Sequence, residues 1–434
     1  MKIIKNFLVA IALCLFCIFF FSCRDTNSLE GIPSEYADLP GTLIPRDTVW
    51  AGDLRLKGQY YVMPGVTLTI LKGSTVIWEY HNNNIEDVGA LITMPADRVS
   101  FEGGPRPSGK LIANGTADEP IVFTSSRSTK FAGDWGGIIL AGEAPNNIEG
   151  GEGRVEGLPQ TIRYGGDNSM DDSGSLRYLR IEYVGFGLQP GSEINGLSLY
   201  SVGSETTLEH IQVYKSTDDG FEWFGGTVNS KYLVSMFSND DSFDMDLGWN
   251  GKNQFWLGIQ ADGADNGFEG DGNITGNSDE TNPVIYNATL AGHGPTEGQD
   301  INAGMNLRNT FKGSINNTLI YNFGGAPWKL DASTFSNYEQ ESLQFDSMLI
   351  YENGEWETND GTAFSDDFID TDPDFFNSSP PAFNFTPQAV SAAQGISPPD
   401  NGFFDIEADY IGAFDPDATA PWINEGVWIR FNDD

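Results

Sequence analysis

A short acidic and aromatic motif recurs three times in the middle of the chain and could carry chemistry. It reads Asp-Asp-Gly-Phe-Glu-Trp at 218–223, Asp-Asp-Ser-Phe-Asp-Met at 240–245 and, more loosely, Asp-Asn-Gly-Phe-Glu-Gly at 265–270. The phenylalanines of successive copies lie 22 and 25 residues apart. Carboxylates stand before or after each phenylalanine, and grouped carboxylates can bind a hard cation or transfer protons.

The carboxylates after each phenylalanine predict a cation site. If the copies are stacked parallel strands, the acidic side chains share one face and equivalent residues lie ~4.8 Å apart, where ionised carboxylates repel one another. Nearby basic residues are few: Lys215, Lys231 and Lys252. Bound Ca²⁺ would relieve the repulsion, and a solvated acidic face without metal is the alternative. The candidate calcium ligands are Glu222, Asp244, Asp246, Glu269 and Asp271.

The aspartate pairs before the phenylalanine are the candidates for catalysis. An inverting polysaccharide hydrolase needs two carboxyl groups ~6.5–9.5 Å apart. Polygalacturonase-like β-helix hydrolases also carry Gly-His-Gly and a basic pair, but here His293 comes 52 residues after Asp241 and the pair Arg308 and Lys312 is wrongly spaced. No cluster of basic residues marks the base of a lyase, so the sequence favours a non-catalytic protein. If the protein is an enzyme, the expected acid and base come from Asp218, Asp219, Asp240 and Asp241.

The rest of the chain predicts an all-β solenoid that positions these residues. Short β-type runs such as 66–70 and 121–123 alternate with Gly, Asn and Asp, and no convincing helical period follows the N-terminal region. A repeat of 20–30 residues suits one coil of a parallel β-helix, whereas a propeller blade needs ~40–45 residues. Phe221, Phe243 and Phe268 should then stack inside the solenoid.

Several stretches resemble a known group of proteins. They are 64–70, 133–138, 219–228, 241–244 and the sequence Asp-Tyr-Ile-Gly-Ala-Phe at 409–414, which Trp422 and Trp428 follow. These stretches are similar to uncharacterised right-handed parallel β-helix lipoproteins and secreted proteins of Bacteroidota and related Gram-negative bacteria. The resemblance covers most of residues 50–434. It implies an all-β, right-handed parallel β-helix of the pectin-lyase-like type and an envelope location, and it carries no assigned catalytic residues.

The first 23 residues have the layout of a bacterial secretory signal. Lys2 and Lys5 precede an apolar stretch from 7 to 21, which is shorter than the ~20 residues of a membrane-spanning helix. All three cysteines of the chain lie in these 23 residues. The pair Ser22-Cys23 resembles a lipobox, which implies cleavage before Cys23 and its lipidation. An ordinary signal peptide with incidental cysteines is the alternative.

The charge limits the partners and the composition divides the chain. With 23 basic and 62 acidic residues and a net charge of −39, the protein should not bind nucleic acid or anionic lipid through charge. We expect a lipoprotein signal peptide at 1–22, a lipid-anchored tether at 23–45, the parallel β-helix at 46–355 and a Pro- and aromatic-rich segment at 356–434. That last segment should cap the open end of the coil stack.

These features together predict an outer-membrane lipoprotein on the periplasmic or the cell-surface face. It would be held in the membrane by its lipid anchor and would act as a binding or accessory component in carbohydrate or nutrient capture. The expected partners are a glycan ligand or an outer-membrane uptake channel. A β-helix polysaccharide hydrolase or lyase is one alternative, and a structural or adhesive solenoid is another.

Overall fold

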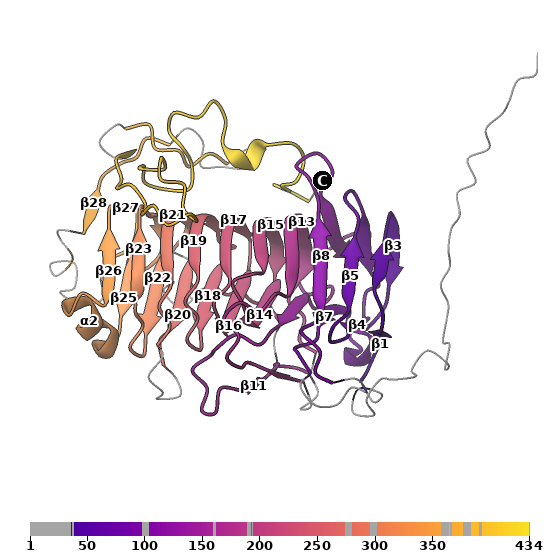
Figure 1. Cartoon of the computed structure of the whole chain (residues 1–434). Coiled ribbons are helices and arrows are strands. Elements are labelled where there is room, and N and C mark those ends of the chain that lie inside the picture. The colour runs from indigo at the N-terminus through magenta and orange to yellow at the C-terminus, as the bar shows by residue number, and fades with distance from the viewer. Residues whose placement is uncertain are drawn as a thin grey trace, which may run out of the picture.

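The computed structural model describes residues 36, 39–97, 104–158, 162–188, 192, 194–273, 280–295, 302–356, 364, 367–375, 383–389 and 393–433. Figure 1 shows that these residues form one long solenoid of stacked parallel strands. The predicted right-handed parallel β-helix is confirmed. The predicted signal peptide at 1–22 and Cys23 lie outside the described residues, as does most of the predicted tether.

Two parallel sheets make up the solenoid within the described residues. The ten-stranded sheet contains, in spatial order, β1 (Thr42–Ile44), β4 (Gln59–Val62), β7 (Ala90–Thr93), β10 (Ile138–Ala141), β14 (Leu197–Val202), β16 (Phe221–Gly226), β18 (Phe243–Asp246), β20 (Phe268–Asp271), β22 (Met305–Arg308) and β25 (Trp328–Leu330). A separate antiparallel pair consists of β11 (Gly153–Arg154) and β12 (Arg163–Tyr164).

The sixteen-stranded sheet bends around the rest of each coil. Its main path contains β2 (Thr48–Trp50), β5 (Thr67–Ile70), β8 (Lys110–Asn114), β13 (Gly174–Val184), β15 (Thr207–Ser216), β17 (Asn229–Met236), β19 (Lys252–Ile259), β21 (Val284–Gly294), β24 (Leu319–Phe323), β27 (Met348–Tyr351) and β28 (Phe368–Asp370). The remaining strands are β3 (Asp53–Leu56), β6 (Thr75–Trp78), β9 (Ile121–Ser125), β23 (Gly313–Asn316) and β26 (Leu343–Asp346).

A corner inside the long strands gives each coil three sides. Strand β13 pairs through its first half with β8 and through its second half with β9. Tyr178 lies between the halves with a φ of 48°, and His210, Tyr232 and Phe255 occupy the same corner in the next coils with φ values of 55°, 57° and 63°. This left-handed conformation turns the chain within one residue and stacks the four rings outside the solenoid, with centroids 4.2–4.8 Å apart.

The core follows from the alternation of the repeat. Phe221 pairs in register with Phe243, and Phe243 with Phe268. All three side chains are fully buried, and the ring centroids of successive phenylalanines lie 5.5 and 5.7 Å apart. Trp256 from the opposite wall stacks on Phe243 at 4.5 Å. The predicted internal aromatic ladder is therefore confirmed.

The stack extends past both predicted limits of the β-helix. Strand β1 begins at Thr42, inside the predicted tether, and β28 ends at Asp370, inside the predicted cap. A short helix, α2 (Ala332–Glu339), interrupts the last coils where no helix was expected. The Asp331 side chain caps it by accepting a hydrogen bond from the Thr334 amide. With two short 3₁₀ turns, η1 (Ile85–Asp87) and η2 (Trp422–Asn424), it completes the named elements.

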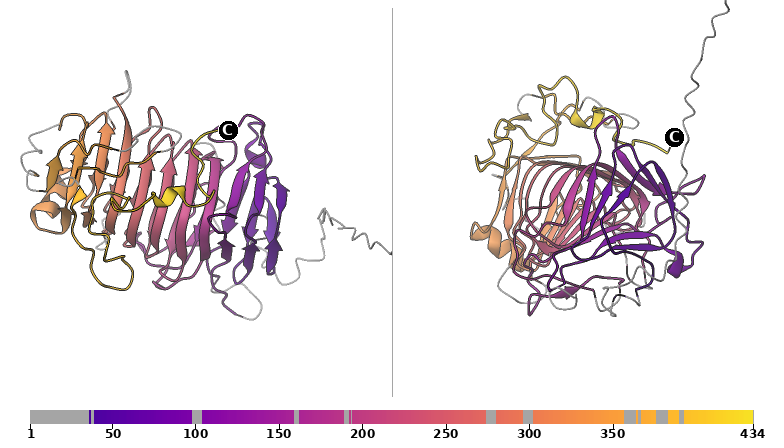
Figure 2. Two further views of the ribbon diagram at one scale, coloured as in Figure 1. Left: turned by 90° about the horizontal axis from the view of Figure 1, so that it is seen from above. Right: turned by 45° about the vertical axis from the view of Figure 1, so that its right-hand side comes forward.

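The C-terminal segment differs from the prediction. The rings of Trp356 and Phe364 do pack on Trp328 in the last coils. Residues 393–433, which we call the return segment, instead run back along the flank of the sixteen-stranded sheet (Figure 2). Asn317 donates to the Ile396 carbonyl at 2.8 Å, and Gln212, several coils earlier, donates to the Arg430 carbonyl at 2.7 Å. The expectation that the whole segment caps the open end is thus wrong for these residues.

The outward-facing corner residues explain why the return segment lies there. An uncovered row of stacked rings would be a large exposed apolar patch. Trp422 packs on Tyr232 and Trp428 on His210, with centroids 5.2 and 5.4 Å apart. A segment rich in proline and aromatics can stay extended and span several coils in few residues.

Candidate functional site

The outer face of the ten-stranded sheet carries the predicted acidic residues. Strand pairing places Glu222 beside Asp244 and Asp244 beside Glu269, so these three carboxylates form one row across β16, β18 and β20. Asp246 and Asp271 follow two residues later on β18 and β20, on the same face. We call these five residues the acidic column. Their predicted grouping on the face opposite the phenylalanine ladder is borne out by this strand register.

One end of the acidic column has a cationic partner that the sequence analysis missed. Arg308 on β22 pairs in register with Asp271. Its guanidinium donates two hydrogen bonds to the Glu269 carboxylate, one of them at 2.9 Å, and a third to Asp271 at 3.2 Å. The sequence analysis considered Arg308 only as part of a basic pair in a hydrolase. Alignment of Met305 with the phenylalanines of the repeat would have found it, because Arg308 then falls on the acidic face.

The other end of the column lacks such a partner. Among the described residues, no lysine, arginine or histidine forms an ion pair with Glu222, Asp244 or Asp246. Glu222 accepts a hydrogen bond from the buried Asn195 amide, and Asp244 accepts one from the Met245 backbone amide at 2.7 Å. Three neighbouring carboxylates therefore have only neutral donors.

Burial and mutual repulsion shift the protonation of these groups. Desolvation, together with the nearby carboxylates, raises the pKa of Glu222 and of Asp244 well above its usual range. The same causes raise the pKa of Asp246 to about 7, although Arg308 works against them. Without a bound cation, this end of the column thus takes up protons on folding.

Two of the four candidate catalytic aspartates have a clear structural task. Asp219 accepts a hydrogen bond from the Asp241 backbone amide at 2.9 Å, and Asp241 accepts one from the Asn266 amide at 2.5 Å. Asn266 continues the ladder by accepting from the Ala303 amide at 3.3 Å. Burial raises the pKa of both aspartates, which makes them resemble the neutral asparagine of the next coil. They join successive coils through side-chain to backbone bonds.

The aspartates also form tight groups of oxygen atoms. Asp218, Asp219 and Asp240 place one carboxylate oxygen each within 4.8 Å of the others. The same holds for the sets 219/222/244 and 240/241/265. The structure therefore brings the four aspartates together in overlapping groups, because Asp240 shares one group with Asp218 and Asp219 and another with Asp241.

The donor set suits a hard cation. Every candidate ligand is a carboxylate, and Ca²⁺ prefers six to eight oxygen ligands at ~2.3–2.6 Å. The buried Oδ1 atom of Asp271 has no hydrogen-bond partner. Asp219 belongs to one oxygen group with Asp218 and Asp240 and to a second with Glu222 and Asp244, so the groups are continuous. Asp219, Glu222 and Asp244 fit Ca²⁺ by chemistry and spacing, and Asp246, Glu269 and Asp271 fit it by chemistry.

An excursion of the chain borders the column. Residues 142–158 and 162–172 leave the stack, and the ring of Tyr164 packs against Tyr200 at 4.9 Å. Tyr200 in turn stacks on Phe224 at 4.0 Å, beside Glu222 on the same face. The three rings are buried, so they hold the excursion in place and are not free to stack on a ligand.

Histidine has no part in this site. The ring of His293 approaches Asp262 at 3.6 Å, away from the four candidate aspartates. His81 is buried and bonded to the Gly133 carbonyl at 3.1 Å. The Gly-His-Gly sequence therefore has no catalytic setting among the described residues.

Comparison with known proteins assigns the family. A family model described as a pectate-lyase-like β-helix domain matches residues 42–373, which is well over half of the chain. The protein belongs to the pectate-lyase-like β-helix family. No curated protein and no solved structure gives a significant match. For this pectate-lyase-like protein, the family assignment fits a carbohydrate-related role and does not separate binding from hydrolysis.

Proposed function

We propose that this protein is an envelope lipoprotein that binds carbohydrate at the acidic column with the help of bound Ca²⁺. The supporting observation is the uneven charge of the column. Glu269 and Asp271 share Arg308, whereas Glu222, Asp244 and Asp246 have only neutral donors in the part of the chain that the structure describes. A bound cation would balance the charge of Glu222, Asp244 and Asp246, as Arg308 balances the charge of Glu269 and Asp271.

Bound Ca²⁺ would also supply the contact to a sugar. Glu222, Asp244 and Asp246 would hold the ion, which would offer its open coordination positions to sugar hydroxyl or carboxylate oxygens. Without a cation, a surface of this charge repels an anionic glycan. The family assignment supports carbohydrate as the ligand class, since the match includes all strands of the column.

Calcium should stabilise the protein, and the column should carry the effect. Because an ion that binds only the folded state stabilises it by mass action, we expect about 2–4 kcal/mol at 100–1,000 times the dissociation constant. Asp244→Asn combined with Asp246→Asn should abolish this gain. The double variant should be at least as stable as the parent without calcium, because it relieves repulsion. Thermal melts with calcium and with chelator measure both effects.

Two controls separate metal binding from simple screening. Sodium chloride at matched ionic strength tests screening. The exposed pair Asp400→Asn with Asp409→Asn removes the same charge elsewhere and should keep the calcium response. Equal stabilisation by calcium and by sodium would contradict the metal site and leave a solvated acidic face.

A polysaccharide hydrolase is the second candidate, and the pKa of Asp246 favours it. A carboxyl group with a pKa of about 7 can donate a proton near neutral pH. Its neighbours Glu269 and Asp271 are held by Arg308. In this case the double variant of Asp244 and Asp246 would lose turnover on a glycan, while the melting temperature would stay flat with calcium.

The membrane anchor is a separate part of the proposal. No helix in the described part of the chain is long and apolar enough to cross a membrane. Cys23 lies outside the described residues, and its lipidation rests on the sequence of the signal. An outer-membrane uptake channel is proposed as partner only because of the resemblance to β-helix lipoproteins.

Replacing Cys23 by Ser should release the protein from the membrane fraction or leave it unprocessed. One acyl chain holds a protein to a membrane only marginally, whereas two or more hold it firmly. Fractionation with metabolic fatty-acid labelling measures the change. Unchanged membrane association of Cys23→Ser would contradict the anchor, and Cys17→Ser serves as the matched control.

A further inference from the structure

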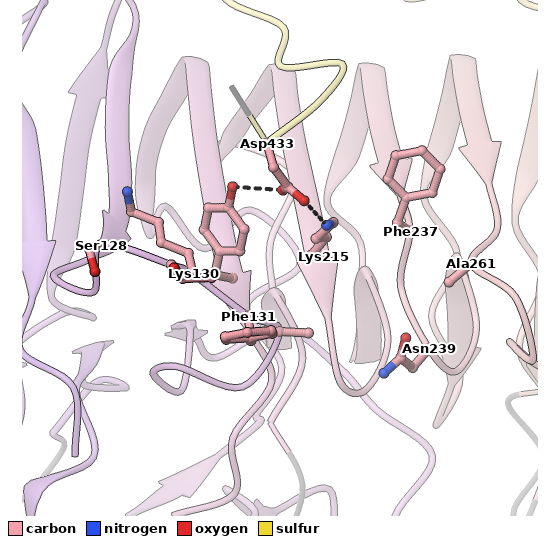
Figure 3. A pocket seen from close by; sticks show the side chains of 11 residues that line it. Ser128, Lys130, Phe131, Lys215, Phe237, Asn239, Ala261 and Asp433 are labelled. Carbon is pink, nitrogen blue, oxygen red and sulfur yellow. Dashed lines mark hydrogen bonds and ion pairs between the residues drawn. The ribbon is translucent and has the colours of Figure 1, made fainter. Parts of the chain in front are cut away.

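A pocket with a volume of about 520 Å³ opens on the sixteen-stranded sheet, at the carboxyl ends of β13, β15 and β17. Figure 3 shows Lys130 and Phe131 on the loop between β9 and β10, and Lys215, Phe237 and Asp433 around them. A volume of this size is typical of small-molecule sites. The acidic column contributes no residue to this pocket.

The floor of the pocket is built from strained residues in register. Tyr183, Lys215 and Phe237 come from three successive coils, and their φ values are 64°, 62° and 64°. This left-handed conformation is uncommon for residues other than glycine, and here, as at the Tyr178 corner, it turns the chain between two sides of the coil. Here it places a lysine between two aromatic rings.

A carboxylate of the protein itself already lies in this pocket. Lys215 Nζ lies 2.5 Å from one Asp433 oxygen. The other oxygen accepts hydrogen bonds from the Tyr183 hydroxyl at 3.0 Å and from the Tyr214 hydroxyl at 3.2 Å. Yet the Asp433 side chain is 55% exposed, so a ligand can displace it. The pocket therefore recognises a carboxylate through one ammonium group and two hydroxyl groups.

Lys130 and Phe131 lie at the mouth of the pocket. Lys130 Nζ is 5.9 Å from the centroid of the Tyr183 ring. The Phe131 side chain is 53% exposed, and the Arg127 guanidinium lies 4.9 Å from its ring centroid. In a chain with 62 acidic and only 23 basic residues, two lysines in one pocket form a distinct positive site.

We propose that this pocket binds a small ring-bearing carboxylate, with the carboxylate on Lys215 and the hydroxyl groups of Tyr183 and Tyr214, and with the ring between Phe131 and Phe237. Asp433 occupies the carboxylate position until the ligand displaces it. The charge-assisted hydrogen bond from Lys215 selects the anion, and the aromatic side chains select a flat or chair-shaped ring. A sugar acid and an aromatic acid share this chemistry. The proposal does not depend on the function proposed for the acidic column.

Calorimetric titration of the whole protein with glucuronate and with phenylacetate tests the proposal and separates the two sources. Glucose and phenylacetamide are the uncharged controls. Asp433→Asn removes the internal competitor and should tighten binding by about threefold to tenfold, whereas Lys215→Met should weaken it by at least about tenfold, as expected for a charge-assisted contact. Lys72→Met removes an exposed lysine that pairs with Glu119 and should leave the affinity unchanged.

The outcomes are distinct. Binding of one or both acids, with opposite effects of Asp433→Asn and Lys215→Met, supports the site and identifies the ligand source. Equal affinity in Lys215→Met and in the parent overturns it, as does the absence of binding to both acids in a folded Asp433→Asn variant. Circular dichroism of each variant establishes that it is folded. Lys130→Met provides a second weakened variant at the pocket mouth if Lys215→Met does not fold.

Discussion

Replacing Phe243 by Ala should lower the free energy of unfolding by about 3–5 kcal/mol, the range for large-to-small changes in a packed core. Phe243 is fully buried and touches rings on three sides: Phe221 in the preceding coil, Phe268 in the next, and Trp256 across the core. The cavity cannot close easily, because each of these rings is also held by its own coil. Chemical denaturation monitored by tryptophan fluorescence measures the loss.

Two further substitutions serve as comparisons for Phe243→Ala. Phe221→Ala should cost a similar amount, since Phe221 is equally buried and stacks on Phe243 and Trp223. Phe131→Ala removes the same group from an exposed position and should change the stability by no more than about 0.5 kcal/mol. A loss below about 1 kcal/mol for both core variants would mean that the stacked register does not carry the stability of these coils.

Replacing Arg308 by Met should destabilise the protein by about 2–3 kcal/mol at neutral pH. Loss of one partner from a fully buried ion pair costs ~3–5 kcal/mol, and the 37% exposure of the Arg308 side chain reduces this figure. The variant would leave Asp271, whose side chain is only 4% exposed, without its counter-ion. Arg163→Met breaks an exposed pair with Glu152 and should cost less than about 1 kcal/mol.

The pH dependence of this loss has a definite sign. Burial already raises the pKa of Asp271, and removal of Arg308 raises it further. An acid with a raised pKa in the folded state binds more protons when folded than when unfolded, so its contribution to stability decreases as the pH rises. The deficit of Arg308→Met should therefore grow as the pH rises above about 4, the usual pKa of an aspartate. A deficit independent of pH would show that Arg308 acts through packing and not through the carboxylates.

The fold and the two faces of the repeat could be predicted from the amino-acid sequence alone. The 22-residue spacing of the phenylalanines is one coil of a parallel stack, and the alternation of Phe221 with Glu222 separates inside from outside. Both features are local, because strand alternation needs only neighbouring residues and the repeat needs only self-similarity. The aromatic ladder and the acidic column could be predicted for this reason.

The partners of the acidic side chains could not be predicted from the sequence, because they depend on tertiary packing. Arg308 lies 37 residues after Asp271, beyond a longer coil, so nothing in the local pattern places it beside the column. The same coil geometry showed that Asp219 and Asp241 bond to the backbone of the next coil, whereas the sequence left them as candidate catalysts. A counter-ion or a ladder bond depends on which coils are neighbours and on the exact stagger between them.

The path of the C-terminal chain also depends on tertiary packing. Its prolines and aromatics predicted a packed, non-helical segment, but not the surface on which it packs. That surface exists only once the corners of successive coils have stacked Tyr178, His210 and Tyr232 into one apolar row. The return segment covers this row and brings Asp433 to Lys215, 218 residues earlier in the chain. No local sequence pattern could predict a pocket formed by residues so far apart, because only long-range packing brings them together.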